Sequence, residues 1–539
     1  MIGNGRLRAV IAAVMICLSL CACGEDDDGS GGNFFAVIEN NPENLDPQLA
    51  EDRSSQFIIR NIYATLMEPD GSGDVARGAA ESVTVSEDGL VYTFTLRQGL
   101  VWRGTSGDDV PLTAHDYEFA FKRIYDPDTH SPYRELFSCI KDTMAYYEGT
   151  SASMGVTAED DRTLVIELVE PDCDFLRLMC HTAASPCNEQ LFLSTGSRYG
   201  LSVNDVYCCG AFYVTEWNYD PYWTENRLIL EKIGANSKDG YRTYPHSLQV
   251  EISGDREEAE LKNNTLCDGY GIDDRSEYTG DVTRRYDLNE YCCKTSFLMV
   301  RPGSALSAEE NREARLALAA AVRRADISED LAEGSSIAGG IFPSQLFSGG
   351  HSLRELCGDM GHDGIYGSIA PAQAWENFRE DNPGEDTNSY VLLVSDDYPS
   401  PAAAEEIITS FEEELGFYCM PVYEDSRDYD RWVSEGDYDL RIGTVASRSG
   451  LAADFARETV LQSGAAGAET AAQRLSGGAD LNEKGSRAAE FEREIISGGY
   501  AVPVSYETAY FLTSTDTEDI RYDPFGDVIF YKYARKYGE

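Results

Sequence analysis

Residues 79–123 read AAESVTVSEDGLVYTFTLRQGLVWRGTSGDDVPLTAHDYEFAFKR and carry the clearest secondary-structure pattern of the chain. Apolar and polar side chains alternate with period two over Val91–Leu96, which predicts a β-strand with one buried face. The preceding Ser86–Gly89 has the composition of a turn. Thr113 is a good N-cap for residues 114–123, whose apolar positions recur at helical spacing. The stretch therefore predicts a turn, a strand and a helix in that order.

Strand-like and helix-like segments also alternate outside this stretch. Leu164–Leu168 and Leu228–Glu231 have the period of strands, whereas Asn311–Arg324 and Ala402–Leu415 have the composition of helices. Because strands separated by helices are typical of α/β domains, the sequence predicts an α/β fold with partly parallel sheets.

Seven sequence blocks keep one order along the chain. They are LDPQLAEDRSSQFIIRNIYATLMEPD from Leu45, residues 79–123, DPDTHSPYREL from Asp126, GAFYVTEW from Gly210, EARLALAAAVRRADI from Glu313, EGDYDL from Glu435 and YAVPVSY from Tyr500. In this order the blocks resemble the family 5 extracellular solute-binding proteins, the oligopeptide, dipeptide and nickel receptors of ABC importers. The resemblance covers residues 45–506.

This resemblance implies a type II periplasmic-binding-protein-like fold with two lobes and an additional inserted N-terminal domain. Lobe one would combine residues 33–80, 205–301 and 505–539, the inserted domain would span residues 81–204, and lobe two would span residues 302–504. In such a fold the lobes close on a ligand and remove it from water, so polar groups at the junction must be paired in the closed form.

The resemblance also implies a function. We expect a substrate-binding lipoprotein that captures extracellular oligopeptides, or related small solutes, and delivers them to the permease subunits of an ABC importer. The backbone of a peptide can be held by main-chain groups, as in strand addition. Two alternatives are a sensor or signalling lipoprotein for peptides, and a degenerate structural or adhesive envelope protein that binds no ligand.

Several candidate ligand-binding residues transfer by position. Glu51 and Arg53 fall where peptide-binding members line the cleft, and Tyr133 resembles a tyrosine that borders the ligand. Thr295, Ser296 and Phe297 replace the family's usual Thr-Tyr-Tyr run in the strand that returns between the lobes. Each of these residues has the alternative of an ordinary surface or packing role.

One departure from the family concerns the ligand's free amino group. Peptide-binding members pair this group with an aspartate in a Gly-Trp-x-Ala-Asp-Tyr motif, but residues 441–448 read RIGTVASR, so the position falls on Ser447 or Arg448. A buried ammonium without a counter-charge is costly. Either another acid such as Asp454 substitutes, or the ligand lacks a free amine there, and Arg448 could face an anionic group. The simpler alternative is a local deletion with the ligand class unchanged.

The N-terminus has the pattern of an export signal. Arg6 and Arg8 precede an apolar run, Val10–Leu20, that is too short for a stable membrane anchor. The following Leu-Cys-Ala-Cys resembles a bacterial lipobox and predicts residues 1–22 as signal peptide with lipidation at Cys23; an unlipidated secretory signal is the alternative. The acidic, glycine-rich residues to Gly32 predict a flexible linker. The expected location is the extracellular face of the bacterial membrane, or the periplasm, with membrane contact through the lipid alone.

Composition and motifs exclude several other functions. A formal net charge of −50 argues against nucleic acid as a partner and against a protein lying on an anionic membrane. The usual nucleophile-elbow, zinc-protease and P-loop motifs are absent from the sequence, so we expect no enzyme and no cofactor. Eleven of the 14 cysteines follow Cys23, without any Cys-x-x-Cys spacing among them, which favours disulfides or buried thiols over a metal site.

Overall fold

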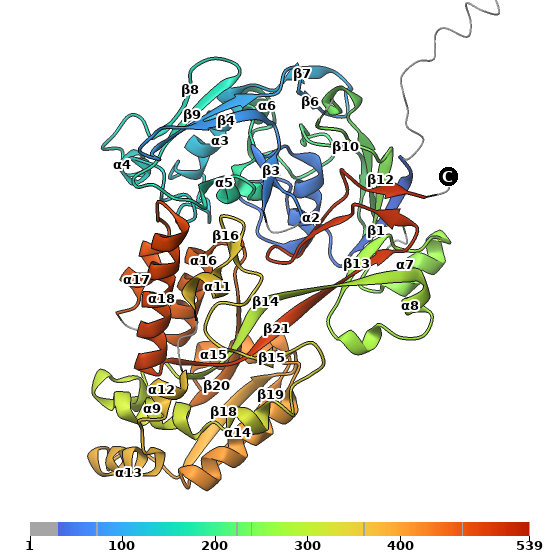
Figure 1. Ribbon diagram of the computed structural model, residues 1–539. Helices are drawn as coiled ribbons and strands as arrows, with labels where there is room; N and C mark the ends of the chain where they lie inside the picture. The colour runs from blue at the N-terminus through green and yellow to red at the C-terminus, as the bar shows by residue number, and fades with distance from the viewer. Residues whose placement is uncertain are drawn as a thin grey trace, which may run out of the picture.

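The computed structural model describes residues 31–71, 74–222, 225–238, 240–358, 362–465 and 467–537. The predicted signal peptide, Cys23 and the first part of the linker lie outside the described residues. Two lobes follow one another along the molecule and are joined by a pair of long strands (Figure 1). Within the described ranges, every helix is too short or too polar to cross a membrane.

Lobe one is built on a four-stranded sheet in the order β1-β12-β11-β10. The bounds are β1 Asn33–Ile38, β12 Ser247–Ile252, β11 Arg227–Lys232 and β10 Phe212–Asn218. β1 and β12 are parallel, and the other pairs are antiparallel. Helix α2 (Arg53–Ile62) contacts β10 and also β24 (Val528–Phe530), so both ends of the chain contribute to this lobe.

A second four-stranded sheet, ordered β4-β5-β9-β8, lies beside lobe one. The bounds are β4 Ala80–Val85, β5 Val91–Leu96, β9 Thr163–Glu167 and β8 Val156–Ala158, with helix α3 (Ala114–Ile124) packed on β8 and β9. The strand and the helix predicted from residues 79–123 are confirmed. Alternate residues of β5 are buried, and α3 begins with a capping box between Thr113 and Asp116. This region shares one continuous hydrophobic core with lobe one.

A seven-stranded mixed sheet lies mainly in lobe two and reaches lobe one through the connecting strands. Its strands are β13 Gly269–Ile272, β21 Ala501–Ser514, β14 Tyr286–Val300, β20 Leu440–Ala446, β18 Ser389–Ser395 and β19 Tyr418–Glu424 in that order, with β15 Ser336–Ile337 beside β21. β18 is parallel to β19 and β20, as predicted for a partly parallel sheet, whereas β14 is antiparallel to β20 and β21. The principal helices are α9 Arg312–Ala321, α13 Pro371–Asp381, α14 Pro401–Glu414, α15 Ser426–Glu435, α16 Ala452–Ser463 and α18 Leu481–Gly498. They enclose a second hydrophobic core, separate from the first.

The predicted helix over residues 311–324 is wrong at its C-terminal end. Helix α9 stops at Ala321, and Val322 has an extended backbone. Arg323 then reaches across to α14, where its guanidinium pairs with Glu406 and Glu413 at 2.7 Å each. These ion pairs hold the chain in a bend that the helical composition of the segment does not indicate.

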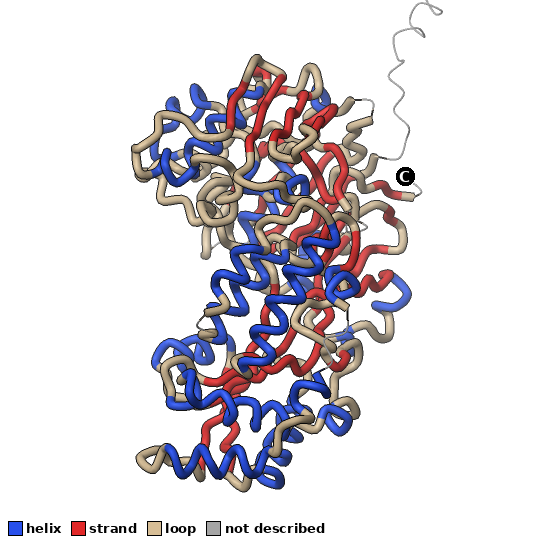
Figure 2. The backbone as a smooth tube through the Cα atoms, turned by 60° about the vertical axis from the view of Figure 1, so that its left-hand side comes forward, coloured by secondary structure: helices blue, strands red, loops and turns tan. Residues whose placement is uncertain are grey.

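Strands β14 and β21 connect the two lobes. Their register runs from Tyr286 opposite Ser514, near lobe one, to Met299 opposite Ala501 in lobe two. In Figures 1 and 2 this ribbon crosses the middle of the molecule. The two cores are therefore joined by a hydrogen-bonded ladder, which is an arrangement that allows hinge motion.

Two of the resembling blocks contact each other through a buried ion pair. The Arg123 guanidinium, at the end of α3, contacts the Asp46 carboxylate at 2.6 Å and 3.0 Å and donates to the Gln48 side chain at 2.7 Å. All three residues are buried. The Asp46–Gln48 segment is thereby fixed directly before Glu51 and the start of α2, where part of the site lies.

Candidate ligand-binding site

A pocket of about 290 Å³ lies where lobe one, the second sheet region and lobe two meet. Its walls come from the start of α2, from residues 177–182, from the loop after β20 and from residues 523–528. The principal polar side chains are those of Glu51, Arg53, Gln56, Arg60, Tyr133, Arg177, His181, Thr182, Arg448, Ser449, Asp523 and Asp527. We call this the small pocket.

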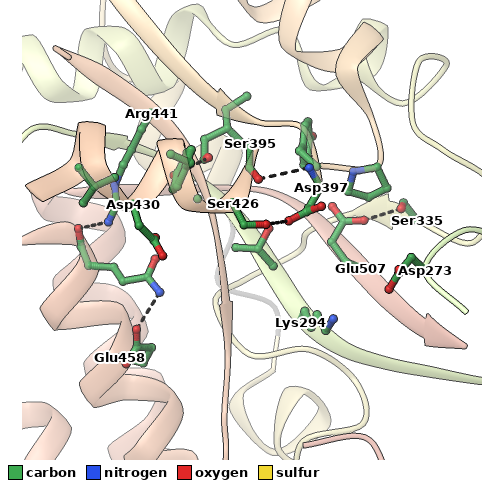
Figure 3. Close-up of a pocket in the computed structure, with 18 of the residues that line it drawn as sticks. Asp273, Lys294, Ser335, Ser395, Asp397, Ser426, Asp430, Arg441, Glu458 and Glu507 are labelled. Atoms are coloured by element: carbon green, nitrogen blue, oxygen red, sulfur yellow. Dashed lines mark hydrogen bonds between the residues drawn. The ribbon is translucent and has the colours of Figure 1, made fainter. Parts of the chain in front are cut away.

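A larger pocket of about 1,020 Å³ follows the face of lobe two beside the connecting strands. Figure 3 shows side chains from β14, β21, β18 and the helices of lobe two around it. Arg53 lines both pockets, so the two spaces adjoin at the start of α2. The combined volume suits a ligand of several residues.

The small pocket brings four of the predicted site residues together. Glu51, Arg53, Tyr133 and Arg448 all line it, although they are far apart in sequence. Arg53 forms an ion pair with Asp527 at 2.8 Å.

Tyr133 has a fixed position in this wall. Its hydroxyl donates to the Ala50 carbonyl and accepts from the Gln56 amide at 3.1 Å. Its ring lies edge-on to His181, with 5.3 Å between centroids. Burial, and then the negative charge of Glu51, raise the pKa of Tyr133 far above its ordinary value, while the positive charge of Arg448 opposes this shift. Tyr133 therefore remains a neutral hydrogen-bonding group.

The other four predicted residues do not reach either pocket. Thr295 donates to the Ile341 carbonyl at 2.8 Å, and Phe297 lies in the core of lobe two. Ser296 shares a hydrogen bond of 2.9 Å with Thr444, which itself lines the large pocket. Ser447 is fully buried in the loop after β20. A ligand contact by any of these four residues stays a prediction.

Asp454, the acid considered as a substitute amine anchor, is engaged within the protein. Its Oδ2 atom accepts from the Ser447 hydroxyl at 3.0 Å, the Arg448 amide at 2.8 Å, and the amide and hydroxyl of Ser449 at 3.1 and 3.0 Å. The carboxylate therefore fixes the loop that carries Arg448, and it lines neither of the two pockets.

The large pocket combines carboxylates with hydroxyl groups. Glu507 on β21 is buried, and its two oxygens accept from Ser505 and Ser335 at 2.5 Å each. Asp397 accepts from the Ser426 hydroxyl (Figure 3). Lys294 on β14 also faces this space, and its ammonium has no ion pair with any residue that the structure describes. The pocket thus offers hydrogen-bonding groups of both polarities.

Sequence reasoning missed several residues of the small pocket. Arg60 enters it from α2, Arg177 and His181 from the short helix α5 (Phe175–Leu178) and the turn after it, and Asp523 from the end of strand β23 (Arg521–Asp523). Burial lowers the pKa of His181 to about 4, with a further contribution from the positive charge of Arg60, so this imidazole is neutral at physiological pH. Only Arg60 belongs to a resembling block, and nothing in the local sequence distinguishes it from a surface arginine.

One group of potential metal ligands exists among the described residues, and a lysine ammonium already lies within it. Potential ligand atoms of Asp172, Cys173 and Asp174 lie within 4.8 Å of one another. The buried Lys484 ammonium, however, contacts the two carboxylates at 3.1 and 2.9 Å. It thus takes the position of a cation, and the site is an ion-pair cluster that we call the Lys484 cluster.

Comparison with known proteins agrees with this architecture. Residues 74–236 match the model of the bacterial extracellular solute-binding proteins, family 5 middle region. The chain is 30% identical over 250 residues to the oligopeptide-binding protein OppA of Bacillus subtilis, covering 42% of this chain and 45% of that protein. It is 28% identical over 338 residues to the dipeptide-binding protein of Lactococcus lactis, covering 60% of each. The alignments thus span about half of these relatives' length.

Solved structures show the same fold. The oligopeptide ABC transporter substrate-binding domain of Bacillus anthracis superimposes with a TM-score of 0.67 at 20% identity, covering 94% of this chain and 99% of that chain. OppA of Haemophilus influenzae, in complex with RPPGFSPFR, superimposes with a TM-score of 0.70 at 18% identity and the same coverage. The chain therefore has the predicted two-lobed, periplasmic-binding-protein-like α/β fold. The resemblance to family 5 is confirmed over residues 74–236, which match the middle region of that family.

Proposed function

We propose that this protein is the substrate-binding lipoprotein of an ABC importer, which captures oligopeptides or related small solutes outside the cell and delivers them to the membrane permease. The observation that carries the proposal is the pair of adjoining pockets at Arg53, whose walls come from both lobes and from the connecting strands. Names of relatives that refer to oligopeptide and dipeptide binding support the ligand class.

In this proposal the small pocket is one end of the ligand cleft and the large pocket extends it. Glu51, Arg53, Tyr133 and Arg448 contact the ligand. Lobe closure removes the ligand from water, and hydroxyl and carboxylate groups of the large pocket pair with its polar atoms. The domain division that follows from the resemblance, with residues 81–204 inserted into lobe one, belongs to the same proposal.

The remaining part of the proposal concerns how the protein is attached to the membrane. Cys23 carries the lipid and becomes the first residue of the mature protein, and the acidic linker holds the folded part away from the membrane. Mass spectrometry of the membrane-extracted protein tests this step. An N-terminal diacylated Cys23 is expected, and a soluble product cleaved elsewhere would contradict the lipid anchor.

Thermal unfolding with ligand pools tests the binding function. The pools are dipeptides to hexapeptides, other small organic solutes, and divalent metal ions. A ligand at 100 times its dissociation constant stabilises the native protein by about 2.7 kcal/mol, which raises the melting temperature by a few degrees. A shift with peptides supports the proposal. A shift with another pool alone would reassign the ligand class, and no shift with any pool would favour an envelope protein that has lost its ligand.

A further inference from the structure

We propose that the small pocket holds an anionic group of the ligand, a carboxylate in the simplest case, and that Arg448 is its principal partner. This inference rests on the proposed solute-binding function and specifies which end of a ligand the pocket selects. It reverses the polarity expected from the peptide-binding members that the sequence resembles, in which an aspartate near this position pairs with an ammonium group.

The charge of the pocket supports an anionic ligand group. Four arginines and three acids line it, whereas the whole chain has 44 basic and 94 acidic residues. Arg53 and Asp527 neutralise each other at 2.8 Å. Three guanidinium groups, those of Arg60, Arg177 and Arg448, then remain against two carboxylates.

Arg448 is the arginine with free donors. Its side chain is exposed and makes neither an ion pair nor a hydrogen bond with any of the described residues. Its main chain, by contrast, is fixed, because the Arg448 amide donates to Asp454 at 2.8 Å. A guanidinium group presents a rigid fork of donors that matches a carboxylate. The loop therefore positions an unused binding group at the pocket.

Arg60 supplies a second, more deeply placed donor. Its Nη1 donates to the Cys180 carbonyl at 2.5 Å, while its Nε atom is buried and has no hydrogen-bond partner within the described ranges. Arg177 is more fully engaged, because it donates to the Gly450 carbonyl at 3.3 Å and stacks on Phe525. Arg60 and Arg177 thus add positive potential behind Arg448.

The two remaining acids offset this potential only in part, because two carboxylates face three guanidinium groups. Asp523 accepts from the Phe525 amide at 3.2 Å and forms no ion pair in the described part of the chain. Glu51 is exposed beside Tyr133. An ammonium placed against Arg448 would face a like charge and would find the Asp454 carboxylate engaged by the loop. A carboxylate at the same place would gain a charge-assisted, bidentate contact.

Binding of end-blocked peptides tests the inference. The same pool of dipeptides to hexapeptides is prepared with free ends, with acetylated N-termini and with amidated C-termini, and affinities are measured by calorimetry with the full mature protein. We expect N-acetylation to leave the affinity within about threefold, and C-amidation to weaken it about tenfold to a hundredfold, as for a lost charged hydrogen-bonded contact. Succinate and glutarate serve as anionic probes without a peptide bond.

A matched pair of variants assigns the effect to the pocket. Arg448→Ala should weaken binding of the free-end pool by about tenfold to a hundredfold and remove its preference over the amidated pool, with Arg448→Lys intermediate. Arg284→Ala in helix α8 (Val282–Arg285) changes the net charge equally. Arg284 is exposed, it pairs with Asp281 at 2.9 Å, and it does not line the small pocket. The Arg284→Ala variant should therefore bind peptides like the parent protein, and all variants should have the melting temperature of the parent.

The outcomes separate this inference from the proposed function. Peptide binding that tolerates C-amidation and Arg448→Ala, but not N-acetylation, overturns the anionic subsite and leaves the peptide receptor standing. If no peptide binds but the dicarboxylates do, and Arg448→Ala abolishes their binding, the anionic subsite stands and the peptide function fails. Absence of binding by peptides and dicarboxylates alike overturns both.

Discussion

At the scale of single residues, Arg123 shows how a charged side chain can determine the position of a binding loop. Its guanidinium is buried against Asp46 and Gln48 and lies over the Phe192 ring at 4.2 Å from the centroid. Burial opposes the charge of Arg123, but the Asp46 carboxylate outweighs this effect and raises the pKa of Arg123 above its ordinary value, so the guanidinium stays charged. Loss of one partner leaves the other charge buried and uncompensated.

We therefore predict that Arg123→Met lowers the free energy of unfolding by about 3–5 kcal/mol. Denaturant titration followed by fluorescence measures this change. Arg284→Met, which removes an exposed arginine paired with Asp281, should change stability by less than about 1 kcal/mol. Equal effects of the two substitutions would show that the buried pair is no more important than a surface pair.

The candidate site could be predicted only in part from single residues. Glu51, Arg53 and Tyr133 were predicted from their positions in resembling blocks, and Arg448 from a departure from the family's motif; the structure brings all four to one pocket. The backbone pattern could not show that Thr295, Ser296 and Phe297 turn into the protein. Strand alternation assigns residues to opposite faces of β14, but all three side chains are buried, Thr295 against the Ile341 carbonyl and Ser296 beside Thr444 of the neighbouring strand β20.

At the scale of elements, the Lys484 cluster joins the second sheet region to lobe two. Asp172 and Asp174 precede helix α5 (Phe175–Leu178), and Lys484 lies on α18. The Cys173 amide donates to the Gly478 carbonyl at 3.0 Å, and the Gly478 amide donates to the Pro171 carbonyl at 2.9 Å. In Figure 1, α18 approaches α5 on one side of the molecule, while β14 and β21 cross on the other. The lobes are therefore held together opposite the connecting strands.

This cluster has one more carboxylate than ammonium, which makes it sensitive to pH. Burial raises the pKa of Asp172 to about 6, Lys484 opposes the shift, and the charge of Asp174 adds to it. Because the pKa in the folded protein lies above the ordinary value near 3.9, the native state holds the proton more tightly than the unfolded state does. The protonated Asp172 carboxyl group therefore contributes to stability below about pH 4, and this contribution is lost as the pH rises to about 6.

We predict that Asp172→Asn, which imitates the protonated carboxyl group, removes the pH-dependent contribution of Asp172 to the free energy of unfolding. The stability of the parent protein relative to the variant should fall between pH 4 and pH 6, by at most about 3 kcal/mol, and should then stay constant. Denaturant titrations at several pH values measure the difference in free energy of unfolding between the parent and the variant. The other carboxylates are common to both proteins, so their effect cancels in this difference. Asp281→Asn, at an exposed position, serves as the control and should follow the parent at every pH. A constant difference between parent and Asp172→Asn would contradict the assignment.

Elements themselves were predictable where the local pattern and the packing agree. The strand at Val91–Leu96 and the helix from Ala114 are confirmed because their apolar spacing matches the buried face. The bend after Ala321 was not predictable, since it depends on ion pairs with a helix about 80 residues later in the chain. Cross-chain contacts of this kind, including those of the Lys484 cluster, leave no periodic signal in the sequence.

At the scale of the whole molecule, the sequence left two possibilities for its eleven cysteines, disulfides or buried thiols. In the structure all eleven are free, and eight of them are buried. Burial raises the pKa of most of these thiols; it reaches about 12 for Cys180, Cys208, Cys267 and Cys293. The thiolate is the reactive form, so these residues resist disulfide exchange even outside the cytoplasm. Hydrophobic packing, and no covalent cross-link, therefore holds both lobes.

We predict that the melting temperature of the native protein is the same with and without a reducing agent. A thiol-reactive dye should label Cys292 first, because its side chain is only half-buried on the strands between the lobes. Burial raises the pKa of the other two half-buried thiols, to about 11 for Cys173 and about 12 for Cys357. Cys292→Ser should remove the fast phase of labelling, and Cys357→Ser should leave it unchanged. Complete unfolding should then expose all eleven thiols. A melting temperature that falls on reduction would instead show that the molecule depends on disulfides, and that its two cores alone do not account for its stability.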